Sequence, residues 1–136
     1  MSRERRKVGA EKLLADLLSS GWYHSFDLPD GARIEGAIPV ETLRRRAAQM
    51  PIPQDLTGKR VLDIGAWDGW FSFEMERRGA EVVAVDCVEL DHFAYMHRTL
   101  GSRVRYVIRD ITELDPKELG TFDIVLCLGV LYHLKH

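Results

Sequence analysis

The sequence predicts an α/β fold: a doubly wound parallel sheet of about four core strands, preceded by an N-terminal helical and hairpin extension. Two observations support this prediction. In the second half of the chain, short β-rich runs alternate with helix-spaced segments, and such alternation indicates parallel strands joined by right-handed crossovers. The predicted strands are also nearly continuous apolar runs, as expected for a sheet with helices on both faces.

The N-terminal extension covers residues 1–54. Leucines at helical spacing predict its first helix, and Gly21 follows as a suitable end. A Pro-Asp-Gly turn signal between two short apolar-polar segments predicts a hairpin. In chain order we expect a helix at 10–19, a hairpin that pairs 22–28 with 32–35 across residues 29–31, a helix at 41–50, and a linker at 55–58 that opens the second part.

The core is predicted to cover residues 55–136. Its expected strands are 60–64, 81–85, 103–108 and 122–128, and its expected helices are 70–78, 90–100 and 116–119. Gly79 and Gly101 follow two of these helices, where a left-handed residue commonly ends a helix.

The composition fits a globular protein, with 46% hydrophobic residues and a net charge of −2. No apolar run reaches the roughly 18 residues that a membrane span needs, and the charged N-terminus has no secretory core, so we expect a cytoplasmic protein without a membrane partner. Cys87 and Cys127 lie in apolar runs and are expected to be buried free thiols. The charge gives no general argument for nucleic-acid binding, and we interpret Arg44-Arg45-Arg46 as a solvated helix face in preference to a phosphate site.

Polar residues and glycines follow the predicted strands, where ligands bind to an open parallel sheet. Gly65 and Gly69 allow a sharp turn and a close approach of the backbone to a ligand. Asp86 ends the second strand, 21 residues after Gly65, which suits an acid that accepts hydrogen bonds from a ribose diol. These features are shared by dinucleotide enzymes and by other nucleoside-binding proteins.

Three features separate the two classes. Trp67 stands where a dinucleotide fingerprint has its second glycine, and its bulk would obstruct a pyrophosphate. Asp63 would repel a pyrophosphate but attract a cationic ligand. Asp110-Ile111 can offer an acceptor and an apolar wall to an adenine. These three features make a nicotinamide-dependent oxidoreductase the weakest functional hypothesis for this sequence.

The segment Val61-Leu-Asp-Ile-Gly-Ala-Trp-Asp-Gly69 resembles the first motif of class I S-adenosylmethionine (SAM)-dependent methyltransferases, Asp-x-Gly-x-Gly-x-Gly, with Trp67 as its one departure. Residues 122–134 resemble the fourth motif. With Gly-Val-Leu-Tyr-His at 129–133 and Gly-Trp-Tyr-His-Ser at 21–25, the chain is similar to the branch with the tRNA wobble-uridine 5-oxyacetic acid, carboxymethyl-transferring enzymes.

The resemblance implies a Rossmann-like, partial class I methyltransferase fold that binds S-adenosyl-L-methionine or a carboxylated derivative. It places Asp63 near the methionine amino group, Asp86 at the ribose and Tyr132 and His133 where an acceptor could approach. His133 would then be a general base, or both side chains would simply pack. The implied cofactor contacts are Asp63, Gly65, Ala66, Trp67, Gly69, Asp86, Cys87, Asp110, Ile111, Leu128 and Gly129.

The resemblance also implies a sheet of seven strands, of which four are recognisable here. We therefore expect an N-terminal fragment of a longer enzyme, or a homo-oligomer or other assembly in which another chain pairs with the fourth strand, in preference to a truncated relative. The alternative to an enzyme is a non-catalytic SAM- or nucleoside-binding module. The acceptor stays open between a small molecule and tRNA.

Overall fold

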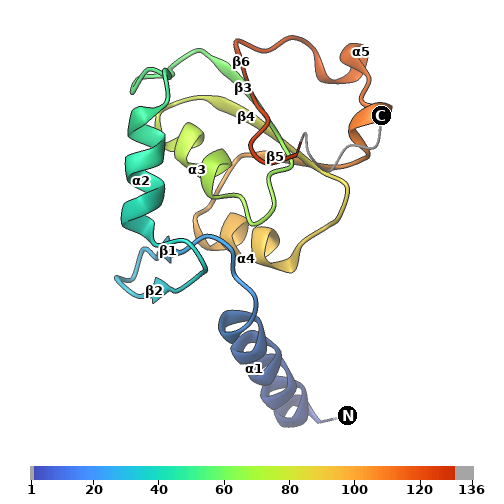
Figure 1. Ribbon diagram of the computed structural model, residues 1–136. Helices are drawn as coiled ribbons and strands as arrows, with labels where there is room; N and C mark the ends of the chain where they lie inside the picture. Colours follow the sequence, from blue (N-terminus) through green and yellow to red (C-terminus); the bar gives the residue numbers. More distant parts are fainter. Residues whose placement is uncertain (1, 131–136) are drawn as a thin grey trace.

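The computed structural model describes residues 2–130, in which a four-stranded parallel sheet has the order β5-β4-β3-β6 (Figure 1). The strands are β3 (Arg60–Ile64), β4 (Glu81–Asp86), β5 (Arg105–Ile108) and β6 (Ile124–Leu126). The chain winds from β3 outward to β4 and β5, then returns to add β6 on the other side of β3. The prediction of an α/β fold with parallel strands is confirmed. The reversal beside β3 creates the switch point where ligands bind to open sheets.

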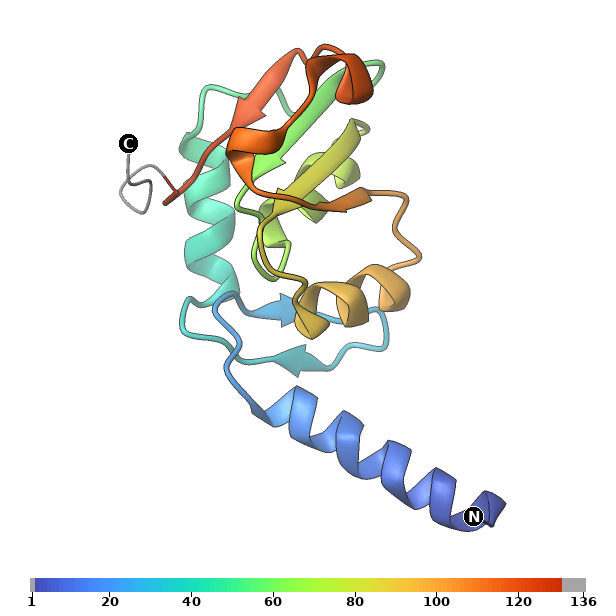
Figure 2. The ribbon, with the colours of Figure 1, turned by 90° about the vertical axis from the view of Figure 1, so that its right-hand side faces the viewer.

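Successive side chains of a strand point to opposite faces, and the two faces of this sheet are covered unequally. The larger core lies on the face that carries Val61 and Val82, where α3 (Trp70–Arg77) and α4 (Asp91–Thr99) pack. The other face, which carries Leu62 and Val83, meets the segment with the 3-10 turn η1 (Ile111–Glu113) and the short helix α5 (Pro116–Leu119). Figure 2 shows η1 and α5 on the opposite side of the sheet from α3.

The expectation of fully buried strands holds for the inner pair and is wrong for the outer pair. β4 is buried from Val82 to Asp86. Val125 of β6, however, is 55% exposed, and Ile108 of β5 is 40% exposed. Within residues 2–130 these outer strands each pair with only one neighbour, which leaves part of each strand exposed.

The N-terminal extension contains α1 (Arg3–Ser19), β1 (Phe26–Asp27), β2 (Arg33–Ile34) and α2 (Val40–Gln49). The hairpin and the second helix are confirmed. α1 begins earlier than predicted because the Ser2 hydroxyl caps it by accepting a hydrogen bond from the Arg5 amide. None of the residues of α1 is buried, and Figures 1 and 2 show the helix projecting away from the rest of the protein.

Two further predictions need correction. Residues 55–58 are not a linker, since Leu56 is 1% exposed and its amide donates to the Arg78 carbonyl at 2.7 Å. The cysteines are free but not buried: Cys87 is exposed and Cys127 half-buried, because each follows the last residue of its strand. Arg44, Arg45 and Arg46 are exposed, as expected for a solvated helix face. Among the described residues, no helix combines the length and apolarity needed to cross a membrane.

Candidate functional site

The loop from Gly65 to Gly69 lies against the end of β4. The amides of Gly65 and Ala66 both donate to the Val85 carbonyl, at 2.8 and 3.2 Å. The amide of Trp67 donates to Oδ2 of Asp86 at 2.9 Å. These three bonds join the carboxyl ends of two neighbouring strands into one surface and bring Asp86 beside the loop.

Three of the five loop residues have left-handed backbone angles. Gly65 and Gly69 have φ values of 74° and 93°, and Trp67 has a φ of 54°. Trp67 is the only non-glycine residue with positive φ within residues 2–130, although its bulky side chain disfavours this conformation. Trp67 is also 44% exposed. The loop backbone is therefore strained at Trp67, the residue at which the sequence departs from the glycine pattern.

Asp63 is a buried carboxylate at the end of β3. It is 3% exposed, and the hydroxyl of Ser72 in α3 donates to its Oδ2 at 2.7 Å. Burial raises the pKa of Asp63 to about 6, although the Ser72 hydrogen bond acts in the opposite direction. The side chain is thus mainly ionised at pH 7, in surroundings that disfavour its charge.

Asp86 at the end of β4 is 8% exposed. Within residues 2–130, its Oδ2 accepts the Trp67 amide, whereas Oδ1 accepts only a long bond of 3.4 Å from the Val88 amide. Oδ1 can therefore accept another donor. Within residues 2–130, neither Asp63 nor Asp86 has a lysine or arginine partner. Two such carboxylates favour a cationic ligand over a pyrophosphate.

Asp110 lies on the same edge of the sheet, two residues after β5. The amide of the preceding residue, Arg109, donates to the Asp86 carbonyl at 2.8 Å. Asp110 is exposed, and Oδ1 accepts from the hydroxyl and the amide of Thr112 at 2.6 and 2.8 Å. These bonds lower the pKa of Asp110. One carboxylate oxygen is thus used to cap η1, and half-buried Ile111 follows directly.

The segment after β6 reaches the same loop. Leu128 and Gly129 are exposed, and a methyl group added to Gly65 would collide with Cγ2 of Val130. The exposed Cys87 follows Asp86 at the end of β4. The predicted cofactor residues that follow β3, β4, β5 and β6 therefore all lie at the carboxyl end of the sheet. The predicted catalytic residues Tyr132 and His133 lie outside the described residues.

Two residues of this site, Ser72 and Asp68, carry little signal in the sequence. Ser72 is the hydrogen-bond partner of Asp63, and a serine within an aromatic helix gives only a weak signal of this role. Asp68 is fully buried and accepts from the amides of Tyr23 and His24, at 3.1 and 2.8 Å, and from Nδ1 of the His24 ring. A histidine among large apolar residues could indicate a buried group that needs a partner, but no spacing rule pairs residues 44 positions apart.

Comparisons with known proteins identify the family of this chain. A family model described as a methyltransferase domain matches residues 61–136. The ubiquinone biosynthesis O-methyltransferase of Xanthomonas oryzae pv. oryzae (strain PXO99A) is 39% identical over 82 residues, which are 59% of this chain and 34% of that protein. The same-named protein of Xanthomonas campestris pv. campestris (strain B100) is 37% identical over 90 residues, 65% of this chain and 36% of that protein.

Solved structures show the same fold. The crystal structure of EvdMO1 has a TM-score of 0.66 and 27% identity, and the match covers 100% of this chain and 31% of EvdMO1. The N-terminal domain of EvdMO1, crystallised in the presence of SAH and D-fucose, matches with the same TM-score and identity over 98% of this chain and 56% of that domain.

The chain spans about a third of the length of the curated relatives that it matches. The family model covers more than half of the chain and includes β4, β5, β6 and all of β3 except Arg60. The chain therefore belongs to the methyltransferase domain family.

Proposed function

We propose that this chain provides the cofactor-binding part of a SAM-dependent methyltransferase. The observation that carries the proposal is the pair of buried carboxylates, Asp63 and Asp86, at the ends of two adjacent strands beside a loop with three left-handed residues. The related EvdMO1 domain was crystallised with SAH (S-adenosylhomocysteine). This match supports an adenosyl ligand.

The side chains on this edge fit SAM. SAM has an amino group, a sulfonium and a ribose diol but no phosphate. Ionised Asp63 suits the positive end of such a ligand, and Oδ1 of Asp86 can accept from a ribose hydroxyl. Trp67 leaves little room for a pyrophosphate, which SAM does not carry.

When bound, SAM supplies a methyl group on a sulfonium, which a nucleophile can displace in line. The residues of this chain would then act by positioning and by excluding water. Asp86 would orient the ribose, and Asp63 would orient the methionine end. We retain His133 as the proposed base for an acceptor that must lose a proton, with Tyr132 beside it.

For the acceptor we propose a hydroxyl group of a small molecule. The curated relatives above are named as O-methyltransferases of ubiquinone biosynthesis, and D-fucose, present with the EvdMO1 domain, also carries hydroxyl groups. A tRNA acceptor with a carboxylated cofactor is the second candidate. It is favoured only by the resemblance of residues 129–133 to that branch.

We also propose that a further strand pairs with β6, supplied by the same protein or by a second chain. Within residues 2–130, β6 pairs only with β3, and its Val125 is 55% exposed. An unpaired apolar edge strand favours association. If this strand pairing is the chain's main role, the protein would be a non-catalytic adenosyl-binding module.

Calorimetric titration with SAM, SAH and NAD tests the proposal. We expect saturable binding of both adenosyl compounds and weaker or no binding of NAD. Tighter binding of NAD than of SAH would overturn the proposal. Binding of SAM without turnover of hydroxyl acceptors by the complete protein would favour the non-catalytic module.

A further inference from the structure

The cofactor loop is attached on two sides. On one side the Trp67 amide is bonded to Asp86 of β4. On the other side Asp68 is bonded to the segment 20–38, which we call the N-terminal strap. All hydrogen bonds that Asp68 accepts within residues 2–130 come from two strap residues, Tyr23 and His24.

The loop needs such attachments because its backbone is disfavoured. Trp67 holds a left-handed angle that residues with side chains rarely adopt. It lies directly before Asp68, the residue that the strap holds. Releasing Asp68 would therefore allow the loop to relax away from the conformation that places Trp67 against Asp86.

The strap is built to hold His24 in place. The Ser25 amide donates to the Ile38 carbonyl at 3.0 Å, and the Ile38 amide donates to the Tyr23 carbonyl at 2.9 Å. Gly36 lies so close that a methyl group there would be 2.5 Å from the His24 carbonyl oxygen. The His24 ring packs edge-on to Phe71 of α3, and the residue is only 7% exposed.

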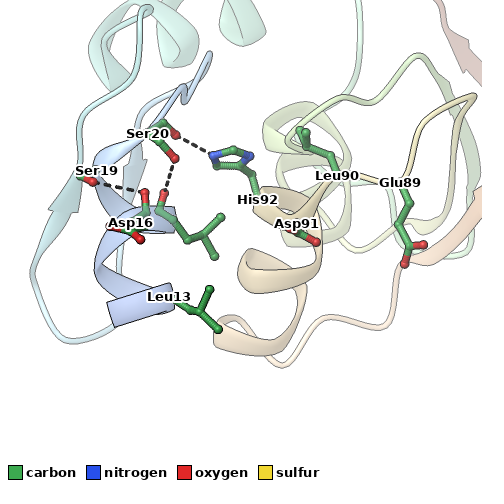
Figure 3. A pocket seen from close by; sticks show the side chains of 9 residues that line it. Leu13, Asp16, Ser19, Ser20, Glu89, Leu90, Asp91 and His92 are labelled. Carbon is green, nitrogen blue, oxygen red and sulfur yellow. Dashed lines mark hydrogen bonds between the residues drawn. The ribbon is translucent and has the colours of Figure 1, made fainter. Parts of the chain in front are cut away.

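A second anchor fixes the start of the strap to α4. Nε2 of His92 lies 2.7 Å from the Ser20 carbonyl and donates to it (Figure 3). The ring of His92 also lies edge-on to Trp22, with centroids 4.4 Å apart. A cavity of about 550 Å³ lies here between the end of α1 and the start of α4. None of the residues of α1 is buried, so the strap makes most of the contacts between this extension and the site.

We propose that His24 is a positioning residue for the cofactor: through Asp68 it holds the loop ready to bind, so strap docking and cofactor binding are coupled. The proposal rests on the proposed function. His24 is buried against Phe71 and Asp68, so it acts through Asp68. Coupling is reciprocal, and a bound cofactor must therefore stabilise the docked strap.

Three variants of the chain test this coupling by calorimetry with SAH. His24→Ala removes the ring contact with Asp68, and we expect the Kd for SAH to rise at least about tenfold, within the usual range of coupling. His24→Asn keeps a donor near the position of Nδ1, and we expect its Kd to stay within about threefold of the wild type. His97→Ala is the matched control. Nε2 of His97 contacts the carbonyl of Val104, the residue before β5, and not Asp68.

Hydrogen exchange separates coupling from a merely structural role. The amides of Tyr23 and His24 donate to Asp68, so we expect SAH to slow their exchange in the wild type but not in His24→Ala. If His24→Ala does not fold, the wild-type exchange alone decides: no slowing of these amides by SAH overturns the coupling.

Two other results also overturn the coupling. One is an unchanged Kd for folded His24→Ala. The other is equal weakening by His24→Ala and His24→Asn. Failure of the wild type to bind SAH would instead overturn the proposed function, and the coupling with it.

Discussion

The substitution Asp63→Asn is expected to stabilise the ligand-free protein at pH 8 while it weakens cofactor binding. Asp63 is 3% exposed and its only side-chain hydrogen-bond partner within residues 2–130 is Ser72. Asparagine has nearly the same shape, and its carbonyl oxygen can still accept from Ser72. The substitution therefore removes the buried charge and leaves most of the packing.

The magnitude follows from the pKa of Asp63, which burial raises from 3.8 to about 6. This rise corresponds to about 3 kcal/mol between the two protonation states. The native protein holds the proton more tightly than the unfolded chain, so the wild type keeps this stability below about pH 4 and loses it as the pH rises through about 6. Asparagine does not titrate, so the variant should not show this loss.

The stability difference between variant and wild type should therefore grow by about 3 kcal/mol from pH 4 to pH 8. The added amide protons need partners, which lowers the gain by roughly 1–3 kcal/mol at every pH. We expect a net stabilisation of roughly 1 kcal/mol at pH 8. The affinity for SAM should fall by roughly 10- to 150-fold, the scale of a hydrogen bond to a charged group.

Urea unfolding at pH 4, 6 and 8, followed by far-ultraviolet circular dichroism, measures this difference. Asp68→Asn is the matched control. Asp68 is also buried, but its carboxylate accepts three hydrogen bonds from the strap. Replacing this carboxylate with an amide should therefore destabilise the protein at pH 8. A difference between Asp63→Asn and wild type that does not change with pH would refute the reasoning.

Substitutions at three further positions test other parts of the structure. Asp86→Ala should weaken SAH binding by roughly 1.5–3 kcal/mol, measured by calorimetry; an unchanged Kd would place the ribose elsewhere. Trp67→Gly should be more stable to urea than Trp67→Ala by about 1 kcal/mol, because glycine adopts left-handed angles freely; equal stability would argue against the φ of 54° at this residue. Arg78→Met should lower stability by about 3–5 kcal/mol, since the buried guanidinium pairs with Glu74 and donates to the Ala47 carbonyl; a loss under about 1 kcal/mol in urea unfolding would contradict this role.

Features encoded locally could be predicted from the sequence. The β-rich run at 60–64 forms β3 with the same bounds, and Gly79, predicted to end a helix, follows α3 with a φ of 99°. The leucine spacing of α1 also predicted a helix correctly. Helical spacing does not establish burial, however: Leu13 is 72% exposed, because burial depends on what packs against the helix and not on its own periodicity.

Features that depend on distant contacts could not be predicted. Asp68 looks like an ordinary turn residue, and only the folded strap shows that His24 binds it. Trp67 was recognised as a departure from the glycine pattern, but its left-handed backbone and its bond to Asp86 follow from how the loop meets β4. The exposure of Cys87 depends on where β4 ends rather than on the apolar run before it.

The central claim is that an adenosyl cofactor binds at the carboxyl edge of the sheet, over the loop 65–69. Amide nuclear magnetic resonance during titration with SAH tests this claim most directly. We predict that the largest shifts fall on Gly65, Ala66, Trp67 and residues 86–88. Largest shifts at the opposite edge, near Lys59 and Ala80, would contradict it.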